Sequence, residues 1–134
     1  MKSIRILAIS IAVLAIGIGH PCAQTQAPEK PPDLSGTWSG ETVTPNGNDV
    51  LTLVLAKKGD SYSGTISDTL FMLNQIPLQG LKFEKGVLTF YFIILTPDSE
   101  MRVDNTIKLN GSKLAGTWAT ASGETGAYEL ERNK

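Results

Sequence analysis

The side chains that most often carry out catalysis are scarce in this chain of 134 residues. It has one histidine, His20, and one cysteine, Cys22, and both lie near the N-terminus. The 13 Asp and Glu residues fall mainly in expected turns or on outward strand faces, without the matched carboxylate pair that glycoside hydrolysis requires. The sequence therefore predicts a protein that is not an enzyme, with no catalytic residue, no cofactor and no metal site.

Binding chemistry has better candidates, because several aromatic and amide side chains fall on the expected inward faces of strands. Asn105 stands between Val103 and Ile107, and an amide on an apolar face needs a backbone group, a trapped water or a bound molecule as its partner. Tryptophan on such a face either fills the core or stacks on a ligand. We predict that a small apolar molecule would contact Phe90, Phe92, Met101, Asn105, Trp118 and Tyr128.

Residues 1–23 have the pattern of an export signal. Lys2 and Arg5 precede an uncharged apolar run at 6–18, and a break at 19–21 leads to the small residue Ala23. The run is too short for a stable membrane span. We therefore expect cleavage after Ala23 and a secreted or periplasmic protein.

Cleavage at this point would remove both His20 and Cys22, leaving no thiol, imidazole or disulfide in the mature chain. The residue before Cys22 is Pro21 rather than the small residue that lipidation favours, which argues against a lipoprotein. The leader holds two of the 12 Lys and Arg residues and none of the 13 Asp and Glu, so the mature chain would have a formal net charge of −3. No basic patch is present to collect phosphates, so no nucleic-acid partner is expected.

The rest of the chain has the composition of a short tether and one β domain. Residues 24–33 contain three prolines and are typical of a flexible tether, and residues 34–134 form the expected domain. Asn46-Gly47 and Asn110-Gly111 are hairpin signals between runs of alternating apolar residues. The eight expected strands are residues 36–43, 50–57, 61–67, 76–83 (distorted by Pro77 and Gly80), 87–95, 100–109, 113–120 and 126–132.

Eight strands joined by short turns predict an all-β fold, an antiparallel up-and-down eight-stranded β-barrel whose first strand pairs with its last. An open sandwich of two sheets is the alternative. A repeated pattern supports the barrel: the stretch 34–38, Leu-Ser-Gly-Thr-Trp, returns as Leu-Ala-Gly-Thr-Trp at 114–118. Alternation places each central glycine inward beside a tryptophan, where it frees volume for the large side chain.

The Gly36-Thr37-Trp38 opening of the first strand resembles the Gly-x-Trp motif of lipocalin-like and avidin-like barrels, which are calycin-type folds. In lipocalins an Arg near the chain end packs over this tryptophan and closes one end of the barrel. The resemblance implies that Arg132 takes this place over Trp38, as a cation–π pair. The chain is shorter than most lipocalins and lacks their final helix, and it has no set of residues that matches an avidin-like ligand site.

Four consecutive apolar residues fit none of the expected strands cleanly. Leu70, Phe71, Met72 and Leu73 follow the third strand and precede the distorted fourth, which places them at a barrel rim. Apolar side chains at a rim are costly in water unless they cover something. We expect them to form a lid over the barrel mouth or part of a subunit contact.

Together these patterns predict a non-enzymatic binding module of the cell envelope that holds a small apolar ligand in or at the mouth of the barrel. The alternative is a protein-interaction role, with a protein partner or self-association. Compact bacterial barrels that inhibit secreted metalloproteases begin with a similar Ser-Gly-x-Trp strand after a free N-terminal segment, although they normally carry a disulfide. A continuous cavity favours the first function, and a filled interior beside an exposed apolar face favours the second.

Overall fold

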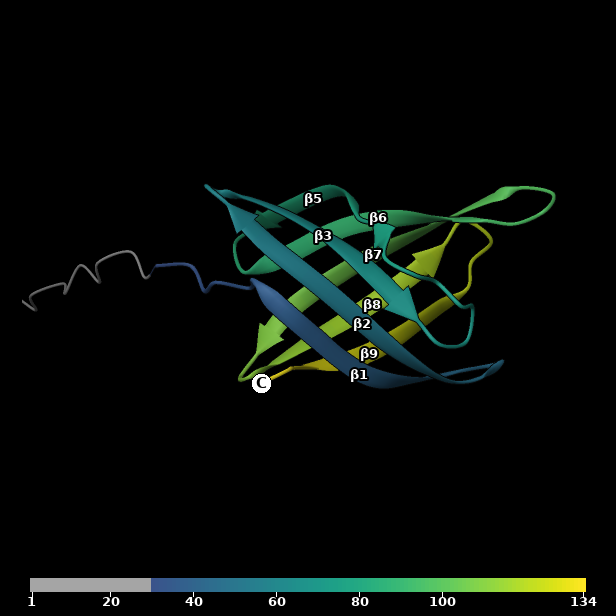
Figure 1. Ribbon diagram of the computed structural model, residues 1–134, viewed down its shortest axis with the longest axis horizontal. Helices are drawn as coiled ribbons and strands as arrows, with labels where there is room; N and C mark the ends of the chain where they lie inside the picture. Colours follow the sequence, from purple (N-terminus) through teal and green to yellow (C-terminus); the bar gives the residue numbers. More distant parts are fainter. Residues whose placement is uncertain (1–29) are drawn as a thin grey trace, which may run out of the picture.

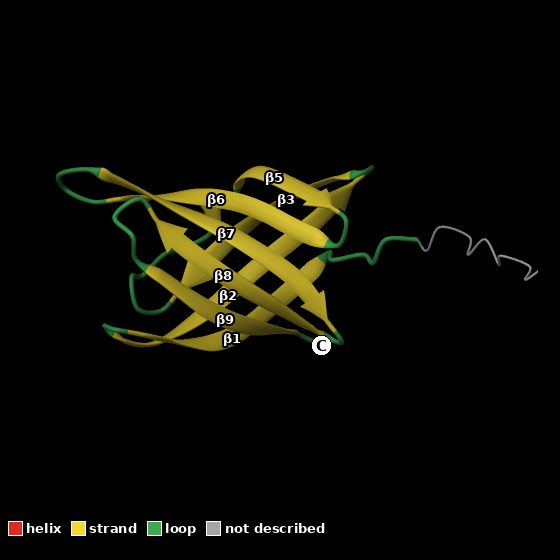
Figure 2. Ribbon diagram, turned by 180° about the vertical axis from the view of Figure 1, so that it is seen from behind, coloured by secondary structure: helices red, strands yellow, loops and turns green. Residues whose placement is uncertain are grey.

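Nine antiparallel strands form the wall of a barrel in the computed structural model of the chain, which describes residues 30–134 (Figure 1, Figure 2). The predicted signal peptide, residues 1–23, and most of the predicted tether, residues 24–33, lie outside the described residues. The strands are β1 Gly36–Thr44, β2 Gly47–Lys58, β3 Ser61–Asp68, β4 Ile76–Pro77, β5 Gln79–Glu84, β6 Val87–Leu95, β7 Glu100–Asn110, β8 Lys113–Thr120 and β9 Thr125–Arg132.

The strands follow an up-and-down order, β4-β3-β2-β1-β9-β8-β7-β6-β5, and each neighbouring pair is antiparallel. The first and last strands pair through Trp38 opposite Arg132 and Ser39 opposite Glu131. The predicted class, an all-β antiparallel up-and-down barrel, is therefore confirmed, and so is the pairing of the first strand with the last.

The prediction of eight strands is wrong by one, because the expected strand at 76–83 divides into β4 and β5. β4 pairs with β3, whereas β5 pairs with β6, and the chain passes from one side to the other at Leu78. Pro77 has no N–H to continue a ladder, and Gly80 has a positive φ of 60°. The expected strand is therefore interrupted near Leu78, and its two parts pair with different neighbours, β3 and β6.

This break leaves the barrel nearly closed, with a seam between β3–β4 and β5 that side chains fill. Leu78 is buried, and its N–H donates to the Gly64 carbonyl at 3.0 Å. The rings of Tyr62 on β3 and Phe83 on β5 meet edge to face with centroids 5.7 Å apart. Apolar contact thus joins β3 to β5, two strands that share no ladder of backbone hydrogen bonds.

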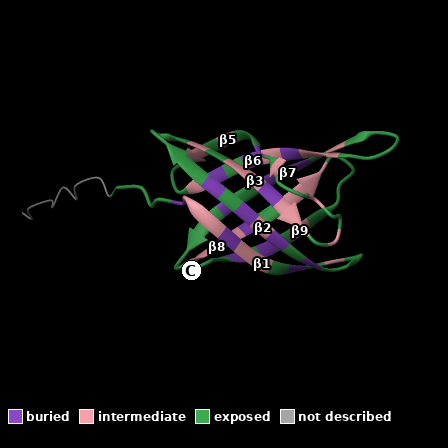
Figure 3. Ribbon diagram, viewed as in Figure 1, coloured by how far each residue is buried: buried purple, intermediate pink, exposed green. Residues whose placement is uncertain are grey.

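The core follows the alternation of side chains along the strands, which Figure 3 shows as alternating buried and exposed positions on the ribbon. On β2, for example, Leu51, Leu53 and Leu55 are all buried. The large side chains that are almost completely enclosed are Trp38, Leu34, Leu53, Leu88, Ile107, Leu114 and Leu130. Within residues 30–134, no helix has the length and apolar character needed to cross a bilayer.

Two glycines on β8 and β9 make room for aromatic rings on the opposite strand. Gly116 is paired with Tyr128, and a Cβ on this glycine would lie 2.3 Å from the tyrosine ring. Trp118 is paired with Gly126, where a Cβ would lie 2.4 Å from the indole nitrogen. The space at Gly116 is thus filled across the strand pair by Tyr128, and not by Trp118 of the same strand as expected.

Candidate binding cavity

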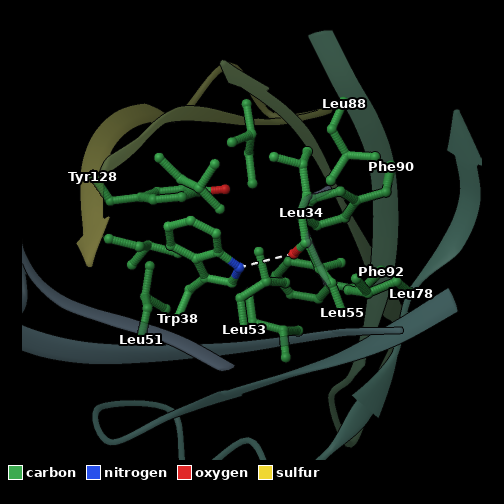
Figure 4. Close-up of a cluster of buried hydrophobic side chains, with 14 of the residues drawn as sticks. Leu34, Trp38, Leu51, Leu53, Leu55, Leu78, Leu88, Phe90, Phe92 and Tyr128 are labelled. Carbon is green, nitrogen blue, oxygen red and sulfur yellow. Dashed lines mark hydrogen bonds between the residues drawn. The ribbon is translucent and has the colours of Figure 1, made fainter. Parts of the chain in front are cut away.

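One end of the barrel is sealed by stacked side chains from the first and last strands, β1 and β9, which are neighbours in the sheet. The Arg132 guanidinium lies over the Trp38 ring, with its Cζ 4.3 Å from a ring centroid. Its Nη2 donates to the Asp33 carbonyl at 2.9 Å, and its Nη1 donates to the Ser35 carbonyl. Beneath it, the indole N–H of Trp38 donates to the Leu34 carbonyl at 2.9 Å, the dashed contact in Figure 4. The structure thus places both predicted barrel-closing residues together at this end.

A cavity of about 190 Å³ lies toward the opposite end, where the β1–β2 and β6–β7 hairpins are found (Figure 1). Its inner wall is mainly apolar, and polar side chains become frequent near the strand ends. The lining residues are Thr42, Thr44, Pro45, Asn46, Asp49, Leu51, Ile66, Asp68, Phe71, Phe92, Ile94, Met101, Val103, Asn105, Trp118, Thr120, Glu124, Thr125 and Tyr128.

The structure brings most of the predicted ligand-contacting residues to this cavity. Phe92, Met101, Asn105, Trp118 and Tyr128 all line it. Phe90 also points inward, but it is packed in the core and is not among the lining residues (Figure 4). The cavity wall therefore includes every residue of the predicted set except Phe90.

A hydrogen-bonded polar pair forms part of the inner wall. The Tyr128 hydroxyl donates to Oδ1 of Asn105 at 2.9 Å, and Nδ2 of Asn105 donates to the Val103 carbonyl at 3.2 Å. Burial raises the pKa of Tyr128, which keeps the phenol neutral. An amide nitrogen carries two hydrogens, so Asn105 retains one further donor beyond the bond to Val103. The wall can therefore offer a polar contact to a molecule in an otherwise apolar cavity.

The loop between β3 and β4 folds around two carboxylates at the rim. Asp49, which is 2% exposed, accepts through Oδ1 from the backbone N–H of Thr69 and Leu70 at 3.0 and 2.9 Å, and from the Thr69 hydroxyl at 3.1 Å. Asp68 accepts from the N–H groups of Phe71 and Leu73 at 3.0 and 3.1 Å. These bonds fix the loop as an ordered part of the cavity mouth.

The four side chains of the predicted rim segment, residues 70–73, have different surroundings. Phe71 is 46% exposed and lines the cavity, whereas Met72 is 85% exposed. Leu73 packs against the core, and Leu70 is half-buried. The segment lies at the rim as expected, and Phe71 is its member at the cavity.

Sequence reasoning missed the carboxylates of the cavity, Asp49, Asp68 and Glu124. Asp49 could have been found, since it continues the inward alternation of Leu51, Leu53 and Leu55 by one more step. It stands between the Asn46-Gly47 hairpin signal and the strand expected at 50–57, and the sequence prediction counts it among the acids in turns or on outward strand faces. Asp68 ends β3 and Glu124 lies in the loop before β9, where strand alternation does not predict which way a side chain points.

Burial raises the pKa of Asp68 above its usual value, and the charge of Asp49 adds to this effect, while the N–H groups of Leu73 and Phe71 oppose it. The folded protein therefore binds this proton more tightly than the unfolded chain does, and ionisation of Asp68 with rising pH lowers the free energy of unfolding. We expect Asp68→Asn to melt at least as high as the wild type at neutral pH, with its relative stability increasing as pH rises from acid.

Thermal unfolding followed by circular dichroism across this pH range measures the effect. Asp60→Asn, in the β2–β3 turn, is the matched control for a change in net charge. A neutral-pH melting temperature of Asp68→Asn below that of the wild type would show that charge-assisted hydrogen bonds to the loop outweigh the cost of burial.

No family model, curated protein or solved structure matches the chain. The function of the candidate site is therefore argued from the geometry of the cavity alone.

Proposed function

We propose that this protein is a secreted or periplasmic, non-enzymatic binding module that holds one small apolar molecule at the open end of a lipocalin-like barrel. The observation that carries the proposal is the cavity of about 190 Å³, with a mainly apolar wall and the buried Asn105–Tyr128 pair. Pockets of this composition, apolar with few polar groups, are typical of small-molecule sites. An engineered cavity of about 150 Å³ in another protein takes up benzene, so this one suits a molecule built around a single ring.

Filling the cavity is the direct test. Val103 is buried and lines the cavity, so Val103→Phe should occupy the space that a ligand needs. We expect this variant to bind a ring-sized neutral probe, 2-phenylethanol, at least about tenfold more weakly than the wild type in ligand-observed NMR, because ring and probe exclude each other. Val54→Phe, on the outer face, is the control and should bind normally. Failure of the wild-type protein to bind such probes would contradict the proposed function.

A protein-interaction role is the second candidate, and the exposed apolar residues at the mouth favour it. Met72 is 85% exposed, Val43 81% and Leu95 76%, and each belongs to a segment at the open end of the barrel. Exposed apolar surface at one end of a barrel suits contact with a partner or with a second copy of the chain.

The double variant Phe71→Ser/Met72→Ser distinguishes a lid from an interface, because neither side chain is enclosed in the core. If the segment is a lid, the variant should remain folded and its interior should take up 2-phenylethanol faster. If it is an interface, the variant should shift the protein to a smaller species in analytical ultracentrifugation. Loss of folding in circular dichroism would instead show that the segment belongs to the core.

A further inference from the structure

A buried carboxylate without a cation faces the cavity. Asp49 is only 2% exposed, and all three of its hydrogen bonds fall on Oδ1. Among residues 30–134, no hydrogen bond to its Oδ2 and no ion pair to either oxygen is formed. Buried charges in proteins are ordinarily paired, because desolvation otherwise penalises them. No buried side-chain oxygen of the described residues lacks a hydrogen-bond partner, so Oδ2, which accepts no hydrogen bond, is reached from the cavity. A positively charged donor in the cavity can therefore approach it.

The rest of the mouth has the same sign of charge. Asp68 and Glu124 also line the cavity, whereas no Lys or Arg is among the lining residues. The side chain of Glu124 makes no ion pair with any described residue. In the described part of the chain, no group of three or more potential ligand side chains is arranged to hold a metal ion. A cation at this mouth is thus better matched by an organic group than by a metal.

We propose that the natural ligand is a small organic amine whose ring-sized apolar body fills the cavity while its ammonium group binds Asp49 at the mouth, beside Asp68 and Glu124. This inference rests on the proposed function and adds the charge of the ligand to it. An ammonium group offers three donors and a positive charge, which Oδ2 of Asp49 can accept without disturbing the bonds on Oδ1. On this proposal, carboxylate ligands such as fatty acids bind more weakly, because they would bring a further negative charge beside Asp49, Asp68 and Glu124.

Three probes that share the phenylethyl body test the proposal: 2-phenylethylamine, 2-phenylethanol and 3-phenylpropionate, which are positive, neutral and negative at pH 7. Isothermal titration calorimetry or ligand-observed NMR gives the three dissociation constants. We expect the amine to bind roughly tenfold more tightly than the alcohol, and the carboxylate to bind most weakly, since a charge-assisted bond is about twice as strong as a neutral one. The preference for the amine should shrink as salt is added.

Variants assign the preference to the carboxylates. Asp49→Asn keeps an Oδ1 acceptor for the loop but removes the charge, so the affinity for the amine should fall about tenfold while that for the alcohol stays the same. Asp60→Asn, which removes one charge far from the cavity at the β2–β3 turn, should leave both affinities unchanged. Should Asp49→Asn fail to fold, Glu124→Gln provides the second test, and it should reduce the amine preference by a smaller factor.

The outcomes separate the two proposals. Equal affinity for amine and alcohol, or an amine preference that survives in both Asp49→Asn and Glu124→Gln, would overturn the inferred charge of the ligand and leave the binding cavity in place. Tighter binding of 3-phenylpropionate than of the amine would do the same. If none of the three probes binds, the proposed function itself fails, and the inference fails with it.

Discussion

Trp38→Ala should lower the free energy of unfolding by about 3–5 kcal/mol, the usual cost of deleting a large buried aromatic side chain. Trp38 is 1% exposed, and its removal would leave a void beneath Arg132 and strip the Leu34 carbonyl of its indole donor. The free energy of unfolding of a single domain is commonly only about 5–15 kcal/mol, so this one substitution would remove a large fraction of the stability of the protein. Urea denaturation followed by circular dichroism measures it.

Trp118→Ala is the matched control, because each tryptophan ends a Leu-x-Gly-Thr-Trp pattern. Trp118 is only half-buried and borders the cavity, so its loss should cost clearly less stability and should weaken probe binding instead. Equal losses of stability in the two variants would mean that both tryptophans serve the core alike. A smaller loss for Trp38→Ala than for Trp118→Ala would contradict the assignment of Trp38 to the closed end.

Sequence patterns could predict the strands and their inward faces because both depend on local chemistry. The alternation in 87–95 and the turn residues on either side give the bounds of β6 as the structure has them, and 113–120 gives those of β8. The division of 76–83 could not be predicted in the same way. The closure of the whole barrel decides which neighbour a short strand pairs with. Local alternation of apolar and polar residues does not specify that neighbour.

The cavity could be predicted in part for a related reason. Alternation tells which side chains point inward, but not how far along the barrel axis each one lies. Phe90 and Phe92 therefore looked equivalent, although only Phe92 reaches the cavity and Phe90 is packed in the core. Asp49 shows the converse, since the pattern placed it inward but its charge and the adjacent turn signal suggested solvent.

The glycine-aromatic pairs depend on register, which the sequence leaves open. The repeated pattern suggested that each inward glycine accommodates the tryptophan two residues further along the same strand. In the structure, strand pairing sets Gly116 opposite Tyr128 and Trp118 opposite Gly126, so each ring lies over a glycine of the neighbouring strand. The spatial partner of such a glycine is decided by cross-strand neighbours, and these follow from the pairing of β8 with β9.

This pairing leads to a second large effect, at Gly116. Gly116→Val should destabilise the barrel by about 1–3 kcal/mol or more through overpacking, because a Cβ here would lie 2.3 Å from the Tyr128 ring. Gly116 is not among the residues with positive φ, so its backbone conformation permits a side chain and the lack of space sets the cost. Displacing the ring would also strain the hydrogen bond from Tyr128 to Asn105 at the cavity wall. Urea denaturation and probe binding should therefore both report the change.

A double-mutant cycle shows whether the ring is the cause. In a Tyr128→Ala background the clash is removed, so adding Gly116→Val should cost little stability or restore some, whereas Ala115→Val on the same strand should have a small effect in both backgrounds. If Gly116→Val costs the same with and without the tyrosine ring, the penalty lies in the backbone. The interpretation of Gly116 as space reserved for Tyr128 would then be wrong. A coupling free energy close to the full cost of Gly116→Val would instead show that the two positions act as one packing unit, which stabilises the sheet and holds Asn105 in place beside the cavity.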